Sequence, residues 1–124
     1  MEPRFYICEI CGNIIEMVND SGVPVVCCGQ KMKELVPNTT DGAAEKHVPV
    51  YEVKDNKVEV CVGSASHPMT EEHSIEWVAL WTEQGVQRKN LKPDKEPKTC
   101  FTICNGDRVK AVYAYCNLHG LWKA

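Results

Sequence analysis

The sequence lacks any long apolar run. No stretch approaches the roughly 20 apolar residues that a membrane helix needs, and the opening residues hold no apolar segment of the kind found in a secretory signal peptide. The basic residues are scattered and the net charge is −3, so no basic stripe is present that could follow the phosphates of a nucleic acid. We therefore expect a cytoplasmic protein with no membrane partner and no nucleic-acid partner.

Internal repeats and low-complexity segments are also absent, and the 124 residues leave room for one ordinary domain or two small ones. Polar, turn-forming residues over 37–44 predict a linker between a cysteine-rich module over 1–36 and a second domain over 45–124. A module as short as the first cannot fold on an apolar core alone. It therefore needs disulfide bonds or a bound metal ion to stabilise its fold.

Eight cysteines are present, and four of them form two close pairs in the first module. A disulfide framework fits these four poorly, because adjacent cysteines such as Cys27 and Cys28 could pair with each other only through a strained ring. Two pairs of thiolates can instead surround one tetrahedral ion, and such a set suits zinc as well as iron. We predict a metal site formed by Cys8, Cys11, Cys27 and Cys28.

The second domain reads as short strands. Alternating valines over 58–62 follow a turn over 54–57 and a shorter alternation over 48–50, which together predict a hairpin. The segment 75–82 is apolar on both faces in its middle, so we expect it inside a sheet. Further strands are expected over 86–91, 99–103 and 109–115, and short extended segments in the first module over 5–7 and 14–18; residues 23–26 lead into the second cysteine pair. The pattern predicts an all-β chain whose second domain is an antiparallel sandwich without helices.

The chain has only four histidines, and all of them fall at expected loops or strand ends. We expect His47 to open a strand, His67 and His73 to lie in one loop, and His119 to follow the last strand together with Cys116. Imidazole is the commonest protein ligand for a transition metal, and a thiolate donates electron density to iron or copper. Four nitrogens and one sulfur therefore indicate a redox-active metal site and not structural zinc.

Three motifs in the second domain contain the histidines and the last cysteine: Glu45-Lys46-His47-Val48-Pro49, His67-Pro68-Met69 with His73, and Cys116-Asn117-Leu118-His119-Gly120. These motifs resemble those of superoxide reductases, and the cysteine pairs of the first module resemble the desulforedoxin type. Together they cover nearly the whole chain, which is similar to the two-iron desulfoferrodoxins.

The resemblance implies a rubredoxin-like or desulforedoxin-like metal ribbon followed by an immunoglobulin-like β-sandwich. It implies two irons in each chain, the first held by four cysteines. The second would be square-pyramidal, with the four imidazoles equatorial, the Cys116 thiolate axial and the opposite position open. The implied reaction is the one-electron reduction of superoxide to hydrogen peroxide. An external, rubredoxin-like protein would donate the electron, and the chain would form a homodimer.

Two charged residues precede the first histidine. By themselves Glu45 and Lys46 read equally well as solvated surface charges or as functional groups at the mouth of a site. The resemblance assigns Lys46 to attracting the anion and holding a proton-donating water, and it lets Glu45 bind ferric iron after turnover. The remaining cysteines, which lie outside the family pattern, are expected to be small buried apolar residues: Cys61, Cys100 and Cys104.

Two other functions fit the residues. The chain could be a rubredoxin-like electron carrier whose second site is coordinatively closed, or a structural or sensor protein with zinc in both sites. An open ferrous position would distinguish a reductase from an electron carrier. Metal analysis with a visible spectrum would distinguish both of these from a zinc protein.

Overall fold

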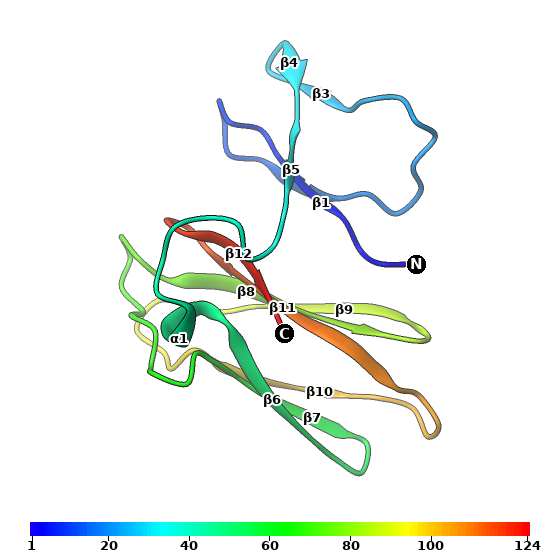
Figure 1. The fold of residues 1–124 in the computed structure, drawn as a ribbon, viewed down its shortest axis with the longest axis vertical. Coiled ribbons are helices and arrows are strands. Elements are labelled where there is room, and N and C mark those ends of the chain that lie inside the picture. Colours follow the sequence, from blue (N-terminus) through cyan, green and yellow to red (C-terminus); the bar gives the residue numbers. More distant parts are fainter. The chain divides into compact units, whose positions relative to one another are not determined.

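The computed structural model describes residues 1–124 and divides them into two compact units, Met1–Val36 and Pro37–Ala124 (Figure 1). Strands dominate both units. The chain has one helix, of four residues, which is far too short to cross a membrane.

The first unit is a small ribbon of five short strands. Three of them form an antiparallel sheet in the order β2-β1-β5, and the other two form a hairpin. Its buried residues are Pro3, Phe5 and Cys8, so the unit has almost no apolar core. The strands are β1 (Phe5–Ile7), β2 (Ile14–Glu16), β3 (Val26–Cys27), β4 (Gln30–Lys31) and β5 (Lys33–Leu35).

The second unit is an antiparallel β-sandwich, as predicted. One sheet has the strand order β10-β7-β6 and the other β12-β11-β8-β9, so β8 is interior (Figure 1). The strands are β6 (Pro49–Lys54), β7 (Lys57–Val62), β8 (Ile75–Thr82), β9 (Gly85–Asn90), β10 (Lys98–Thr102), β11 (Val109–Cys116) and β12 (Gly120–Lys123).

The core of the sandwich follows from the period of two in its strands. Along β7 the three valines are buried and the residues between them face outward. Side chains from the second sheet meet them, and the buried cluster is Val58, Val60, Val62, Ile75, Val78, Leu80, Phe101, Ile103, Val112, Ala114 and Cys116. The predicted hairpin between β6 and β7 is present, with Asp55 at a positive φ of 53° in its two-residue turn.

The expectation of no helix was wrong. Helix α1 (Ala44–His47) precedes β6, and His47 is its last residue instead of the first of a strand. The helix ends there because Pro49 disfavours a helical conformation at Val48, whose ψ is 121°. Strand β12, which pairs with β11 and ends the chain, was not expected either. It is only four residues long and has no alternation of polar and apolar residues.

Candidate metal centres

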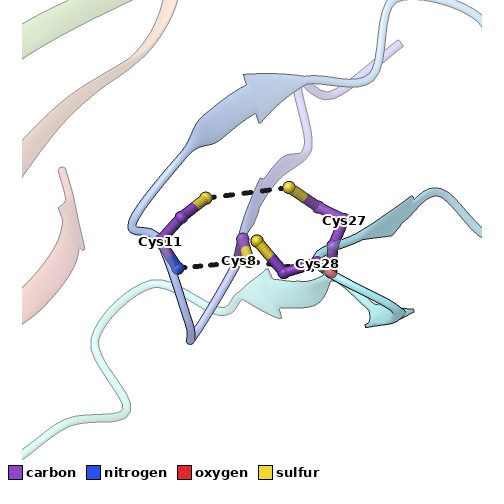
Figure 2. A group of neighbouring side chains, drawn as sticks. All are labelled: Cys8, Cys11, Cys27 and Cys28. Carbon is purple, nitrogen blue, oxygen red and sulfur yellow. Dashed lines mark hydrogen bonds between the residues drawn. The ribbon is translucent and has the colours of Figure 1, made fainter.

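The four cysteines of the first unit come from two facing loops. Cys8 and Cys11 lie between β1 and β2, and Cys27 and Cys28 lie at the turn between β3 and β4 (Figure 2). All four sulfur atoms lie within 4.8 Å of one another, and no disulfide joins them. A tetrahedral ion needs this arrangement of four thiolates.

Hydrogen bonds from backbone amides stabilise a thiolate in this first centre. The Cys11 N–H donates to the Cys8 sulfur at 3.5 Å, and this hydrogen bond helps lower the pKa of Cys8 to about 6. Hydrogen bonding with Cys11 instead raises the pKa of Cys27, and it raises that of Cys28 to about 12. Without a cation, the cluster therefore holds a thiolate readily at Cys8 and keeps protons on Cys27 and Cys28. A bound cation would replace those protons.

The second centre collects residues that are far apart in the sequence. His47 ends α1, while His67 and His73 lie in the segment between β7 and β8. Cys116 ends β11, and His119 lies in the turn before β12. The ligand atoms of His47, His67, His73 and Cys116 lie within 4.8 Å of one another. His119 adjoins this group, with its Nδ1 3.1 Å from His47 Nε2 and 3.7 Å from the Cys116 sulfur.

The four imidazole rings surround a common point. Neighbouring rings meet nearly edge to face, with centroid separations of 4.6 Å for His47 and His67, 4.6 Å for His67 and His73, 5.0 Å for His73 and His119, and 4.7 Å for His119 and His47. His47 and His73 are 6.4 Å apart, so they lie across the circle from each other.

Hydrogen bonds fix the tautomers of two rings. His47 Nδ1–H donates to the Ala43 carbonyl at 2.7 Å, and His67 Nδ1–H donates to the Pro68 carbonyl at 2.6 Å. Each ring then presents an unprotonated Nε2, and these two atoms are 3.1 Å apart. Two facing lone pairs repel unless a cation lies between them. His73 Nε2 is also buried without a hydrogen-bond partner, so the residues present fit a bound metal ion.

In the absence of metal, burial favours the uncharged forms of His47, His67, His73 and Cys116. It lowers the pKa of His47 and His73, and it lowers the pKa of His67 to about 4. Burial raises the pKa of Cys116, which hydrogen bonds from the backbone of Leu118 and His119 partly offset. Neutral imidazoles are the form that binds metal, while the thiol must lose one proton on binding.

Glu45 and Lys46 are exposed on α1, and neither side chain forms an ion pair. Their charges still reach the second centre. The Lys46 ammonium contributes to the lowered pKa of both His47 and His73, and the Glu45 carboxylate opposes it at His47. A cationic side chain therefore lies close to the ring of histidines without neutralisation by a partner.

Sequence reasoning missed residues that support the histidines. Trp122 stacks on His47 with ring centroids 5.0 Å apart, and its indole N–H donates to the His119 carbonyl at 3.0 Å. Gly42 permits this packing, since a Cβ there would come within 3.3 Å of all three side chains. A tryptophan three residues after His119 was the available signal, because i and i+3 meet across a tight turn.

The three remaining cysteines lie outside both centres. Cys61 and Cys100 are half-buried on neighbouring strands β7 and β10. Cys104 is exposed in the loop after β10, so the expectation that it is buried was wrong. Its loop runs over the surface because Asn105 and Gly106 turn the chain there.

Comparisons with known proteins agree over the whole chain. The family described as desulfoferrodoxin matches residues 39–124, and the desulfoferrodoxin N-terminal domain matches residues 2–35. A desulfoferrodoxin homolog of Archaeoglobus fulgidus is 53% identical over 121 residues, which cover 98% of this chain and 95% of the relative. The desulfoferrodoxin of Nitratidesulfovibrio vulgaris is 49% identical, with 98% of this chain and 94% of the relative covered.

The fold of the chain also matches a solved structure over its full length. The crystal structure of the superoxide reductase from Treponema pallidum superposes with a TM-score of 0.85 at 39% identity and covers 100% of this chain and 99% of that one. Family matches to both units, near full-length relatives and a shared fold lead to one conclusion: the chain belongs to the desulfoferrodoxin family.

Proposed function

We propose that this protein is a superoxide reductase, which converts superoxide to hydrogen peroxide with one external electron and two protons. The second centre is the reaction site, and its ligands are His47, His67, His73, His119 and Cys116. Iron held by these residues would supply the electron through its ferrous and ferric states. The observation that carries the proposal is the closed ring of four imidazoles beside one buried cysteine, with His73 Nε2 buried and unpartnered.

The charge of the ligand set suits an anionic substrate. Four neutral imidazoles and one thiolate carry a single negative charge, so a divalent cation among them keeps a net positive charge. Hydrogen bonds from the backbone of Leu118 and His119 spread part of the sulfur's charge onto the protein. A cation held by these residues would therefore attract superoxide, and the Cys116 thiolate would favour its loss of an electron.

Lys46 and Glu45 are proposed as the residues that handle the substrate and the product. The Lys46 ammonium is exposed and lacks an ion pair, and its field reaches His47 and His73, so it would attract superoxide and hold a water that donates a proton. Glu45, its exposed neighbour, would offer a carboxylate to the oxidised iron once peroxide leaves.

We infer a separate role for the first unit, with residues 1–36 as an iron module, 37–44 as a linker and 45–124 as the reductase domain. Iron held by Cys8, Cys11, Cys27 and Cys28 would substitute for the missing apolar core of the module. Cys11 and Cys28 are exposed, which gives an external electron donor access to this centre. A small rubredoxin-like protein is the proposed donor.

The setting of the reaction is proposed from the same features. Free thiols at eight positions fit a reducing cytoplasm, in which the reaction would remove superoxide as a defence against oxidative stress. The strands at the edges of the β2-β1-β5 sheet have unpaired backbone groups, which supports pairing with a second copy in a homodimer.

The proposal is tested by measuring iron, peroxide and oxygen on the same sample. Two irons per chain and one peroxide per superoxide consumed, with no oxygen released, are expected when a chemical reductant is present. Release of oxygen would indicate dismutation instead. Iron at both centres without any reaction would favour the electron carrier, and zinc at both centres would favour a structural or sensor protein.

A further inference from the structure

The side chain of Asn117 joins two segments that carry metal-binding residues. Its Oδ1 accepts a hydrogen bond from the Ser74 N–H at 3.0 Å, and its Nδ2 donates to the Glu72 carbonyl at 2.9 Å. The backbone N–H of Asn117 also donates to the Ser74 carbonyl, at 3.2 Å. These bonds reach the residues on both sides of His73.

Regular strand pairing does not extend to the residues on both sides of His73. The ladder between β8 and β11 shifts register next to the site, since Tyr115 faces Trp77 whereas Cys116 faces Ile75. Such a bulge ends the regular ladder and redirects the side chains beside it. Beyond it, hydrogen bonds from Asn117 replace the ladder.

His73 is held from its other side by Thr70. The His73 N–H donates to Thr70 Oγ1 at 3.1 Å, and the Thr70 N–H donates to the His73 carbonyl at 2.9 Å. This turn fixes the local shape of the segment but does not connect it to β11. The side-chain hydrogen bonds that join the residues beside His73 to the turn after β11 are those of Asn117.

We infer that Asn117 is a positioning residue that sets where the His73 imidazole stands relative to the Cys116 sulfur. The inference rests on the proposed iron site and adds a residue that determines its geometry. His73 Nε2 is buried with no protein partner, so a shift of its backbone changes metal binding directly. Residues that orient ligands in this way typically change metal affinity by about 10- to 100-fold when they are lost.

The test compares three variants of the full-length protein with the parent. Asn117→Ala removes both side-chain bonds, and Asn117→Asp keeps an acceptor for Ser74 but places a carboxylate against the Glu72 carbonyl. Asn105→Ala is the matched control, because it removes a hydrogen bond to Asn56 on the exposed surface. Loss of iron to a chelator, the reduction potential and the electron paramagnetic resonance of each centre are measured.

Asn117→Ala should lose iron from the second centre about 10- to 100-fold faster than the parent, with a shifted potential and resonance. Asn117→Asp should lose iron at a rate between those of the parent and Asn117→Ala, and Asn105→Ala should lose it at the parent rate. The four-cysteine centre of the same molecule should stay unchanged. An unchanged second centre in Asn117→Ala, or equal changes at both centres, would overturn the inference.

A second measurement needs neither iron nor superoxide. In the metal-free protein the Ser74 amide should exchange with solvent faster in Asn117→Ala than in Asn117→Asp, and equal exchange in the two would also contradict the inference. Iron retention and amide exchange do not depend on superoxide reduction. A parent protein that fails to reduce superoxide would therefore refute the proposed function alone.

Discussion

Two buried imidazoles of the second centre are oriented by the same device, a hydrogen bond from Nδ1 to a nearby backbone carbonyl. His47 uses the Ala43 carbonyl within its own helix, and His67 uses that of the next residue, Pro68. Both carbonyls are local, so each ring is oriented by a hydrogen bond within its own segment. Each of the two rings thereby presents its Nε2 to the centre.

At this residue scale, Cys116→Ser should abolish superoxide reduction while the sandwich stays folded. Serine fits the fully buried position of Cys116 but does not ionise near neutral pH, so the ligand set loses its negative charge. Pulse radiolysis measures the reaction and circular dichroism the strands. The control is Cys61→Ser, a half-buried cysteine outside the centre, which should retain both signals. Superoxide reduction by Cys116→Ser at the parent rate would show that the reaction does not need the thiolate.

Lys46→Ala should slow the reaction with superoxide by about tenfold, at the low end of the range for electrostatic steering, and salt should slow the parent more than this variant. Lys46→Arg should keep much of the attraction but misplace the water, since guanidinium is a planar fork. The matched control is Lys54→Ala, which removes the same charge at the far end of β6. The rate of reaction with superoxide is measured over a series of salt concentrations. The same salt dependence in the parent and in Lys46→Ala would show that Lys46 is an ordinary surface charge without a role in the reaction.

Acid should destabilise the metal-free protein through His67. Burial lowers the pKa of His67 from 6.5 to about 4, so the unfolded chain takes up this proton at a higher pH than the folded one. The contribution to stability is complete above pH 6.5, declines as the pH falls toward 4 and changes no further below that. Denaturant unfolding across this range should show the decline in the parent and a smaller one in His67→Gln. A parent midpoint that does not vary with pH would contradict the assignment.

At the scale of elements, the position of His47 depends on a close approach between α1 and the segment after β7. Gly63 has a φ of +83°, and its N–H donates to the Val48 carbonyl. The Ala65 N–H and the Ser64 hydroxyl both donate to the Glu45 carbonyl. The short helix is thus held by hydrogen bonds from a loop, because four residues cannot sustain a helix alone.

Gly63→Ala should displace α1 and weaken the second centre. A Cβ at Gly63 would lie 2.5 Å from the Ala65 carbonyl oxygen and 2.6 Å from that of Lys46, in addition to the cost of a left-handed alanine. Gly106→Ala is the matched control, since Gly106 has a φ of +85° but nothing within 4 Å of the added Cβ. We expect losses in unfolding free energy of about 1 kcal/mol for Gly106→Ala and about 1 to 3 kcal/mol more for Gly63→Ala. Denaturant titration measures both, and equal losses would show that the contact with α1 is unimportant.

At the scale of the whole molecule, the two units differ in what holds them together. The sandwich has a continuous cluster of buried aliphatic residues from both sheets, whereas the first unit buries little beyond Phe5 and Cys8. Metal binding is therefore expected to contribute most of the folding free energy of the first unit, but only a part of that of the second.

Cys11→Ser should disrupt the first centre and leave the second intact. The variant should lose the spectrum of the four-cysteine iron yet reduce superoxide at the parent rate when a chemical reductant supplies the electrons. Cys104→Ser, which changes an exposed cysteine outside both centres, should preserve both iron spectra. Loss of the reaction in Cys11→Ser while the second iron remains bound would show that the units do not act separately.

Residue types and their spacing predicted the metal chemistry and most of the strands. Cysteine pairs in a segment too short for a core indicate a metal staple, and alternating valines indicate the sandwich, because both signals are local in the chain. The sequence did not indicate α1, which is fixed by the approach of Gly63 and by Pro49, nor β12, which exists by pairing with β11.

The way in which the donor atoms meet depends on long-range packing. His47 and His119 are separated by 72 positions, yet their nitrogens are 3.1 Å apart. The buried, unpartnered Nε2 of His73 and the lowered pKa of His67 exist only when β7, β8 and β11 pack together and exclude water. Residue types and spacing specify which atoms can bind a metal, but burial and long-range contacts determine their protonation and their separation.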